Sequence, residues 1–166
     1  MWMLRINMSD RSYKLEDLPE AYKHLAGRAL TSTIVYDEVP PTCHPLGPHN
    51  KLVFSPGYVT GTPAPTSARI SAGAKSPLTG RIGDSLSSDR FAIELKHCGV
   101  DAVVVRGACR ERSMLVVEDG APVLGEPADT AVVPVRRRAY LRDDGLAGGR
   151  ENHPVPKLNY LPPGKR

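Results

Sequence analysis

Apolar and polar side chains alternate at the start of the chain. Within residues 2–8, one side of an extended segment would carry Trp2, Leu4, Ile6 and Met8, and the other side Arg5 and Asn7. This two-residue period predicts a half-buried strand. Residues 9–12 have the composition of a turn. Tyr13 to Leu15 is therefore expected to return as a second strand and complete an amino-terminal hairpin.

Helical spacing of apolar residues marks a first helix. Pro19 suits a first turn, and one helical face then carries Tyr22, Leu25, Ala26, Ala29, Leu30 and Ile34. Gly27 interrupts this pattern, which predicts either a close approach by another backbone or a break in the helix. Pro40 and Pro41 cannot continue the helix, so it ends before them.

A second helix is indicated by an apolar stripe made of Phe91, Ala92, Leu95 and Cys98. Ser85 to Ser88 is expected to form the amino terminus of this helix, because Ser and Asp are favoured capping residues. Gly99 then follows the last apolar position and fits a carboxy-terminal cap. On this pattern Cys98 is a small core residue rather than a nucleophile.

Short apolar runs between turn residues predict further strands. These runs are Leu52–Phe54, Ile70–Ala74, Ala102–Val105 and a hairpin of Met114–Val117 with Ala121–Leu124. The continuous β-branched run at Ala102–Val105 is typical of a strand covered on both faces. The predicted fold class is therefore α+β, with short-stranded mixed or antiparallel sheets and a few helices. We expect one domain over residues 1–133, followed by a basic, Pro/Gly-rich and poorly ordered tail over residues 134–166.

The charge is unevenly distributed over these two parts. The 166 residues carry a formal net charge of +4, of which residues 134–166 contribute +5 and residues 1–133 contribute −1. The body is thus nearly neutral, which argues against a nucleic-acid surface there. Binding of nucleic acid or another anion by the tail stays open as a non-enzymatic alternative.

Composition also bears on location and on metal chemistry. No apolar stretch is long enough for a transmembrane helix, and residues 1–10 do not resemble a secretory signal. The three cysteines, Cys43, Cys98 and Cys109, are far apart and form no Cys-x-x-Cys pair. They cannot build a zinc ribbon or an iron–sulfur site by themselves. A reducing, cytoplasmic setting without a membrane partner is the expectation.

Residues 56–83 are the unusual stretch. They are rich in Gly, Pro, Thr and Ser and contain Arg69. Glycines let a backbone approach a ligand closely, and an arginine can hold a phosphate at two points. The helix amino terminus expected at Ser87 and Ser88 would add a positive dipole end. These residues predict a phosphate or pyrophosphate cradle, while an ordinary loop-rich corner of a β domain remains the alternative.

A resemblance to a known family includes this stretch and extends over residues 2–128. The motifs that carry it are Leu4–Asn7, Leu25–Leu30, Val35–Pro41, Pro45–Val53, Thr60–Thr62, Ala64–Thr66, Arg69, Lys75–Gly80, Glu94–Lys96, Gly99, Asp101–Val105 and Gly107. In this order they resemble the amino-terminal domain of the aldehyde ferredoxin oxidoreductase family. The resemblance implies the sheets of that domain, which hold two pterin–dithiolene ligands around tungsten or molybdenum.

The resemblance also suggests which residues bind the cofactor. Arg69 falls on the family arginine that contacts the pterin. Leu86 falls where the family usually has Asn, and Ser88 where it usually has Gly, so that Leu86, Ser87, Ser88 and Asp89 replace Asn-Ser-Gly-Gly. In the family the Asn contact is made partly through its backbone carbonyl, near a magnesium ion between the pterin phosphates. Leu86 keeps that carbonyl and lacks the amide, whereas Asp89 adds a negative charge.

The family implies an activity that this chain does not cover alone. Its members oxidise aldehydes to carboxylates and pass electrons to ferredoxin through a [4Fe–4S] cluster, whose ligands and substrate pocket lie in later domains. No catalytic residue or metal ligand can therefore be assigned in this sequence. We expect a truncated fragment that is inactive alone. A pterin-binding subunit that joins a separate catalytic chain is the alternative, and a homodimer is compatible with either.

Overall fold

The computed structural model describes residues 1–88, 90–108, 114–118, 121–125, 138–142 and 145–148. The elements in chain order are β1 (Trp2–Asn7), β2 (Ser12–Asp17), the 3₁₀ turn η1 (Glu20–Tyr22), α1 (Gly27–Glu38), β3 (Lys51–Pro56), β4 (Arg69–Lys75), β5 (Ile82–Ser88), α2 (Arg90–His97), β6 (Val100–Arg106), β7 (Met114–Glu118), β8 (Ala121–Gly125), β9 (Arg138–Arg142) and β10 (Gly145–Gly148).

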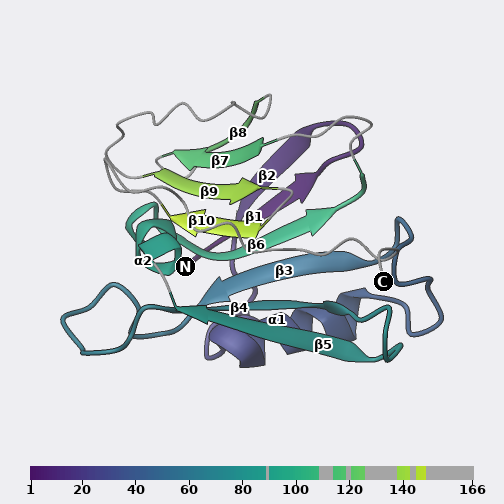
Figure 1. The fold of residues 1–166 in the computed structure, drawn as a ribbon, viewed down its shortest axis with the longest axis horizontal. Helices are drawn as coiled ribbons and strands as arrows, with labels where there is room; N and C mark the ends of the chain where they lie inside the picture. Colours follow the sequence, from purple (N-terminus) through teal and green to yellow (C-terminus); the bar gives the residue numbers. More distant parts are fainter. Residues whose placement is uncertain (89, 109–113, 119–120, 126–137, 143–144, 149–166) are drawn as a thin grey trace, which may run out of the picture.

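The main sheet has six strands in the order β2-β1-β6-β3-β4-β5. Strands β1 and β6 are parallel, and the other neighbours are antiparallel. The sheet is therefore mixed, which confirms the predicted α+β class. In this topology β2 and β5 form its two edges (Figure 1).

A second, antiparallel sheet has the order β10-β9-β7-β8. The predicted hairpin is confirmed as β7 and β8. Strands β9 and β10 lie within residues 134–166, where the sequence pattern indicated no strands. The expected domain boundary at residue 133 lies outside the described residues, as do residues 149–166, so that division of the chain stays a prediction.

Apolar side chains are buried on both faces of the main sheet. One cluster joins strand residues such as Leu4 and Ile70 to Phe91 and Leu95 of α2 and Leu115 of β7. The other cluster joins Met3, Val53, Ala102 and Val104 to η1 and α1. Helix α1 therefore covers one face, whereas α2 and the second sheet cover the other (Figure 1). The prediction that Ala102–Val105 is buried on both sides is confirmed.

The amino-terminal hairpin is confirmed as β1 and β2, but β1 is not half-buried. Met3 is 0% exposed on the α1 face, and Leu4 is 0% exposed on the opposite face. Trp2, expected inside, is 45% exposed. The reason is topological, because β1 lies between β2 and β6 and so is an interior strand with a layer on each side.

The first helical pattern is divided at Gly27. Residues 20–22 form only a 3₁₀ turn, and α1 begins at Gly27 with φ +55°. The backbone of Gly57 lies nearby, because a Cβ on Gly27 would be 3.9 Å from the Gly57 Cα atom. That is an ordinary contact distance, so the break in the helix and the positive φ, rather than a close backbone approach, explain this glycine. The helix ends at Glu38, before the two prolines, as predicted.

The expected helix start at Ser85–Ser88 is wrong, because these residues belong to β5 and pair along β4. Their Ser and Asp side chains mark a polar edge strand here, not a helix cap. Helix α2 begins at Arg90, and it buries Phe91, Ala92 and Leu95 as the stripe predicted. Gly99 follows the helix with φ +76°, which confirms a left-handed residue at this end.

In the part of the chain that the structure describes, no helix has the length and apolar character that a membrane crossing requires.

Candidate functional site

The residues that the resemblance selected come together at one end of the β4–β5 ladder. Arg69 is the first residue of β4 and lies directly opposite Ser88, the last residue of β5. Leu86 lies opposite Ser71, one pair further along the same face. Leu86 and Ser88 follow Arg69 by 17 and 19 positions in the sequence. They are its neighbours in space because the ladder is continuous from Arg69 to Lys75.

The face on which they lie is the one covered by α1. Ser71 Oγ is 3.1 Å from Thr31 Oγ1 of that helix. Since side chains alternate along a strand, Arg69 shares the face of Ser71, and Leu86 and Ser88 share it as cross-strand partners. Ser87 pairs with Ile70, which belongs to the cluster that contains Phe91. The Ser87 side chain therefore lies on the opposite face from the other three.

Arg69 combines a fixed backbone with an unengaged side chain. Its carbonyl accepts hydrogen bonds from Gly57 N (3.0 Å) and Thr60 Oγ1 (3.2 Å), and its N–H donates to the Ser67 carbonyl. The Arg69 side chain is exposed, and its guanidinium has no partner among the described residues. It is a positioned cation that is available to an anion.

The backbone direction in β5 follows from the hydrogen bonds of β4. Arg69 accepts from Gly57, and Lys75 N and O bond to the Asn50 side chain at 3.1 and 3.0 Å. Gly57 and Asn50 flank β3. Every second residue of β4, starting with Arg69, therefore points its backbone N–H and C=O groups toward β3. Their partners on β5 are therefore non-hydrogen-bonded pairs. It follows that the backbone carbonyls of Leu86 and Ser88 point away from β4, toward the open edge of the sheet.

A polar clamp, absent from our sequence predictions, holds this edge strand against α1. Asp84 accepts a 2.6 Å bond from Arg28 Nε through Oδ2 and a very short bond from Ser71 through Oδ1. Thr31 then contacts Ser71. The sequence signal for this clamp is a single carboxylate, Asp84, within the otherwise uncharged residues 82–88. Asp89, the charge expected beside the phosphates, lies outside the described residues.

The beginning of α1 adds a positive dipole end to the same region. Its N-cap, Ala26, makes no side-chain capping bond, and no acidic residue occupies the first turn. Gly27 N is satisfied by Ser55 Oγ at 3.1 Å. Because Gly27 packs beside Gly57, which bonds Arg69, the helix amino terminus, the arginine and the open edge of β5 are parts of one local arrangement.

Metal ligation is not provided by this arrangement. Among the described residues, no group of three or more His, Cys, Asp or Glu side chains is positioned to hold a metal ion. Cys98 packs partly buried against the core, with Sγ 3.8 Å from the Val117 carbonyl oxygen, which agrees with its predicted structural role. A metal at the Arg69 end would have to be held through a ligand or through backbone carbonyls.

Comparison with known proteins identifies the family of this domain. The sequence model described as aldehyde ferredoxin oxidoreductase, N-terminal domain, matches residues 3–132. The tungsten-containing aldehyde ferredoxin oxidoreductases of Thermococcus kodakarensis and Pyrococcus furiosus are 41% and 40% identical to this chain over 118 residues. Each match covers 70% of this chain and 20% of the relative, so the matched part spans about a fifth of those proteins.

A solved structure shows the same fold. The active-site complex BamBC of benzoyl coenzyme A reductase, in complex with 1,5-dienoyl-CoA, superimposes with a TM-score of 0.72 at 27% identity. The superposition covers 75% of this chain and 19% of that one. Fold, motifs and relatives thus agree, and the chain belongs to the aldehyde ferredoxin oxidoreductase family, whose amino-terminal domain it contains.

Proposed function

We propose that this chain binds the tungsten–pterin cofactor of its family at the open end of the β4–β5 ladder. One observation carries the proposal: the unpartnered guanidinium of Arg69 lies opposite Ser88, on the face and at the edge where the Leu86 carbonyl points outward. A cation and a hydroxyl can bind the oxygens of a phosphate-bearing ligand, and a free carbonyl can ligate a divalent cation associated with it.

Each residue would have a distinct role. Arg69 would hold a phosphate or the pterin through two parallel N–H donors. Ser88 would add a hydroxyl beside it, and the Leu86 carbonyl would bind a cation between phosphates. The exposed Leu86 side chain adds no polar contact. Ser87 stays a predicted site residue although its side chain lies on the other face. These residues fit the cofactor, with one amide contact fewer than the family pattern offers.

The chemistry would be shared with other parts of an enzyme. When bound, the cofactor supplies the redox centre for two-electron oxidation of an aldehyde. This chain's own residues bind and orient it. We propose that the cluster, the substrate pocket and the surface that contacts ferredoxin belong to a further part, either of the same chain or of a separate subunit. The domain alone would then hold cofactor without oxidising aldehydes.

The test measures cofactor content rather than activity. The full chain is produced with tungstate in a host that makes the pterin, and tungsten is quantified by mass spectrometry and pterin by fluorescence after oxidation. Arg69→Ala is compared with Arg81→Ala, because Arg81 also lacks a side-chain partner among the described residues and lies at the other end of β4 and β5.

The wild type and Arg81→Ala are expected to retain tungsten and pterin together. Arg69→Ala should retain about 10- to 100-fold less, since a hydrogen bond to a charged group contributes about 1.5–3 kcal/mol. A wild-type chain free of tungsten and pterin would refute the proposal, and so would an Arg69→Ala variant that retains both as well as wild type does.

A further inference from the structure

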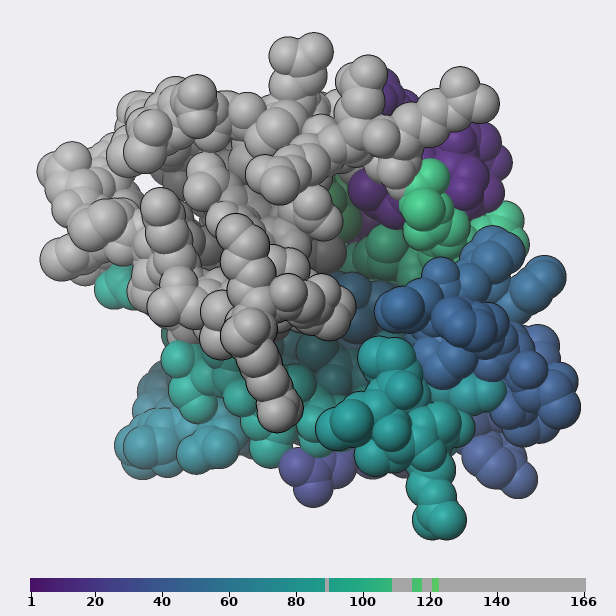
Figure 2. Space-filling view, turned by 45° about the vertical axis from the view of Figure 1, so that its right-hand side comes forward, coloured from purple at the N-terminus to yellow at the C-terminus, as the bar shows by residue number. Residues whose placement is uncertain are grey.

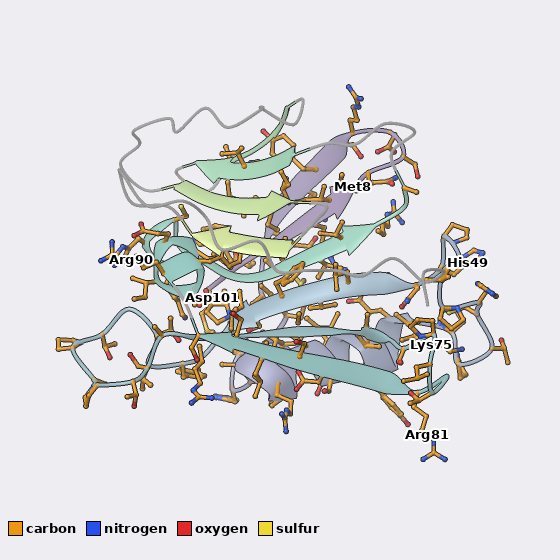
Figure 3. The ribbon with its side chains drawn as sticks, viewed as in Figure 1. Met8, His49, Lys75, Arg81, Arg90 and Asp101 are labelled. Carbon is orange, nitrogen blue, oxygen red and sulfur yellow. The ribbon has the colours of Figure 1, made fainter. Side chains whose placement is uncertain are left out.

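Strand β2 is an open edge of the main sheet. Among the described residues it pairs with β1 alone, whereas the other edge strand, β5, belongs to the proposed cofactor site. Residues 12–17 contain no proline or glycine, and their register with β1 is continuous. Figure 3 labels Asp101, which accepts a bond from Trp2 N at one end of the hairpin, and Met8, which follows β1 at the turn. An edge strand without breaks is able to pair with a further strand.

The backbone groups on the open side of β2 belong to alternate residues. Leu18 N donates to Met1 O at 2.8 Å, so the residue pair just beyond the end of the β1–β2 ladder is hydrogen-bonded. Because hydrogen-bonded and non-hydrogen-bonded pairs alternate in an antiparallel ladder, Asp17, Leu15 and Tyr13 form non-hydrogen-bonded pairs with β1. Their N–H and C=O groups therefore point toward the open side, where no bond joins them to a described residue.

One face of this edge carries exposed apolar side chains. Tyr13 and Leu15 lie opposite Ile6 and Leu4, whose face of the sheet is the one covered by α2 and the second sheet. Tyr13 is 56% exposed, Leu15 is 41% exposed, and Trp2 on the same face is 45% exposed. In Figure 2 the hairpin reaches the surface as the purple atoms at the upper right. Apolar side chains beside a free row of backbone donors and acceptors are what strand addition uses.

The other face of β2 carries one charge of each sign. Lys14 is 74% exposed, and its Nζ lies 2.7 Å from Glu16 Oε2. Glu16 also accepts a 2.6 Å bond from Arg5 Nε. The two charges are two positions apart on the strand, so they determine which alignment a second, identical strand would favour.

Only alignments that bring outward-pointing residues together can form a ladder, and two of these give the longest overlap. Pairing residues 12–16 with residues 16–12 of a second copy would place Lys14 opposite Lys14, which is unfavourable. Pairing residues 13–17 with residues 17–13 would place Lys14 opposite Glu16 twice and Leu15 opposite Leu15. In that register Leu15 would exchange both backbone hydrogen bonds with its counterpart, and Tyr13 would do so with Asp17.

We propose that β2 pairs antiparallel with β2 of a second copy of this chain, with Leu15 opposite Leu15, and joins two six-stranded sheets into one. Charge complementarity favours this occupant and this register. The contact is limited to one strand of each copy, so the dimer is expected to be weak and to depend on concentration. The proposal does not rest on cofactor binding, because β2 and β5 are opposite edges of the sheet.

The first test measures the oligomeric state of the full chain. Sedimentation velocity over about a hundredfold range of concentration gives the dissociation constant of the dimer. Lys14→Glu would place carboxylates opposite each other at both symmetry-related positions, while the side chain remains exposed in the single chain. Lys23→Glu is the control, because it makes the same change of charge after η1 and outside β2.

Wild type and Lys23→Glu are expected to form dimers with similar dissociation constants, and Lys14→Glu is expected to raise that constant about tenfold. A wild type that stays monomeric over the whole range would overturn the proposal, and so would a dimer that Lys14→Glu leaves unchanged. Species that grow beyond a dimer would also overturn it, because a two-fold contact closes after two copies.

A second test, by disulfide cross-linking, examines the register. The two Leu15 Cα atoms would be about 5.5 Å apart, which a disulfide can span. The two Tyr13 residues would be about 14 Å apart along the strands, since each lies opposite Asp17. Oxidised glutathione should therefore cross-link Leu15→Cys several-fold more than Tyr13→Cys, whose yield should match the wild-type background from the native cysteines. Equal cross-linking of both variants, or none above background in Leu15→Cys, would overturn the proposal.

Discussion

Arg69 and Ser88 face each other across the β4–β5 ladder, at the place where the sheet edge opens beside the start of α1. Both backbones are fixed by the ladder and its flanking bonds, whereas neither side chain has a partner among the described residues. The cation and the hydroxyl are thus both available to an anionic ligand. This pair is the reason for placing the cofactor here.

Leu86 offers a gain-of-function prediction at this site. Leu86→Asn would add an amide at a position that is 47% exposed and two residues from Ser88 on the same face. One added hydrogen bond of about 1 kcal/mol would raise retained tungsten and pterin about fivefold. The measurement is metal and pterin content after dialysis. Leu86→Ala is the control, and it should leave retention near the wild-type value. Equal retention by Asn and Ala variants would count against a role for this position.

Gly73 predicts a steric effect on stability. A Cβ at this position would lie 2.8 Å from Thr31 Cβ and 3.0 Å from Thr31 Oγ1. Gly73→Ala should therefore force β4 away from α1 and cost about 1–3 kcal/mol in free energy of unfolding, measured with urea. Gly83→Ala is the comparison, because its Cβ would approach no atom more closely than Ser76 Cβ in the adjoining turn, at 3.1 Å, and would lie at ordinary contact distances of 3.7 and 3.8 Å from Ala74 O and Ser76 Cα. Equal losses for both variants would contradict the explanation.

The strands with strong apolar or alternating patterns could be predicted from the sequence. The run at Ala102–Val105 and the hairpin of β1 and β2 were found because side-chain period reports burial directly. Strand β5 was not found. Its residues are polar and its position is fixed by pairing with β4 and by contacts with α1, which a local pattern does not encode. Ser85–Ser88 therefore resembled a helix cap.

The features of the site also divide into those that the sequence could predict and those that it could not. Arg69 could be selected because it lies in a long motif shared with a family. The Arg28–Asp84 bond could not, since its partners are 56 residues apart. Nor could the outward direction of the Leu86 carbonyl, because it depends on which β4 residues bond to β3. Motifs identified the residues, whereas the register showed which of their atoms are available.

Asp84 should act as a clamp through its hydrogen bond more than through its charge. Arg28 is 64% exposed, so its ion pair with Asp84 contributes little. Ser71 is 1% exposed and would lose an acceptor in Asp84→Ala. We expect Asp84→Ala to cost about 1–2 kcal/mol and Asp84→Asn, which keeps an oxygen acceptor, less than about 1 kcal/mol. Urea unfolding measures both. A loss of more than about 1 kcal/mol for Asp84→Asn would show that the charge of Asp84 dominates.

The surroundings of Glu38 predict that the free energy of unfolding depends on pH, and they determine the sign of that dependence. Burial alone would raise the pKa of Glu38, but hydrogen bonds from Arg5 and Lys51 outweigh burial and hold this pKa below the ordinary value of 4.5. Those bonds are 2.6 to 2.7 Å long. A carboxyl whose folded pKa is depressed stabilises the protein above its unfolded pKa, and this stabilisation is lost as pH falls through the folded pKa.

Glu38→Gln should therefore lower the free energy of unfolding by about 2–3 kcal/mol at pH 7, because two partly buried cations lose their common partner. The difference from wild type should shrink as the pH falls below 4.5, the ordinary pKa at which Glu38 of the unfolded chain takes up a proton, and should be smallest below the depressed pKa of the folded state. Urea midpoints at pH 7 and at about pH 3 measure this. Glu20→Gln is the control, because the Glu20–Lys23 pair is exposed and should leave the midpoint nearly unchanged. A Glu38→Gln difference that is as large in acid as at pH 7 would mean that packing, and not the charge of Glu38, holds α1 to β1 and β3.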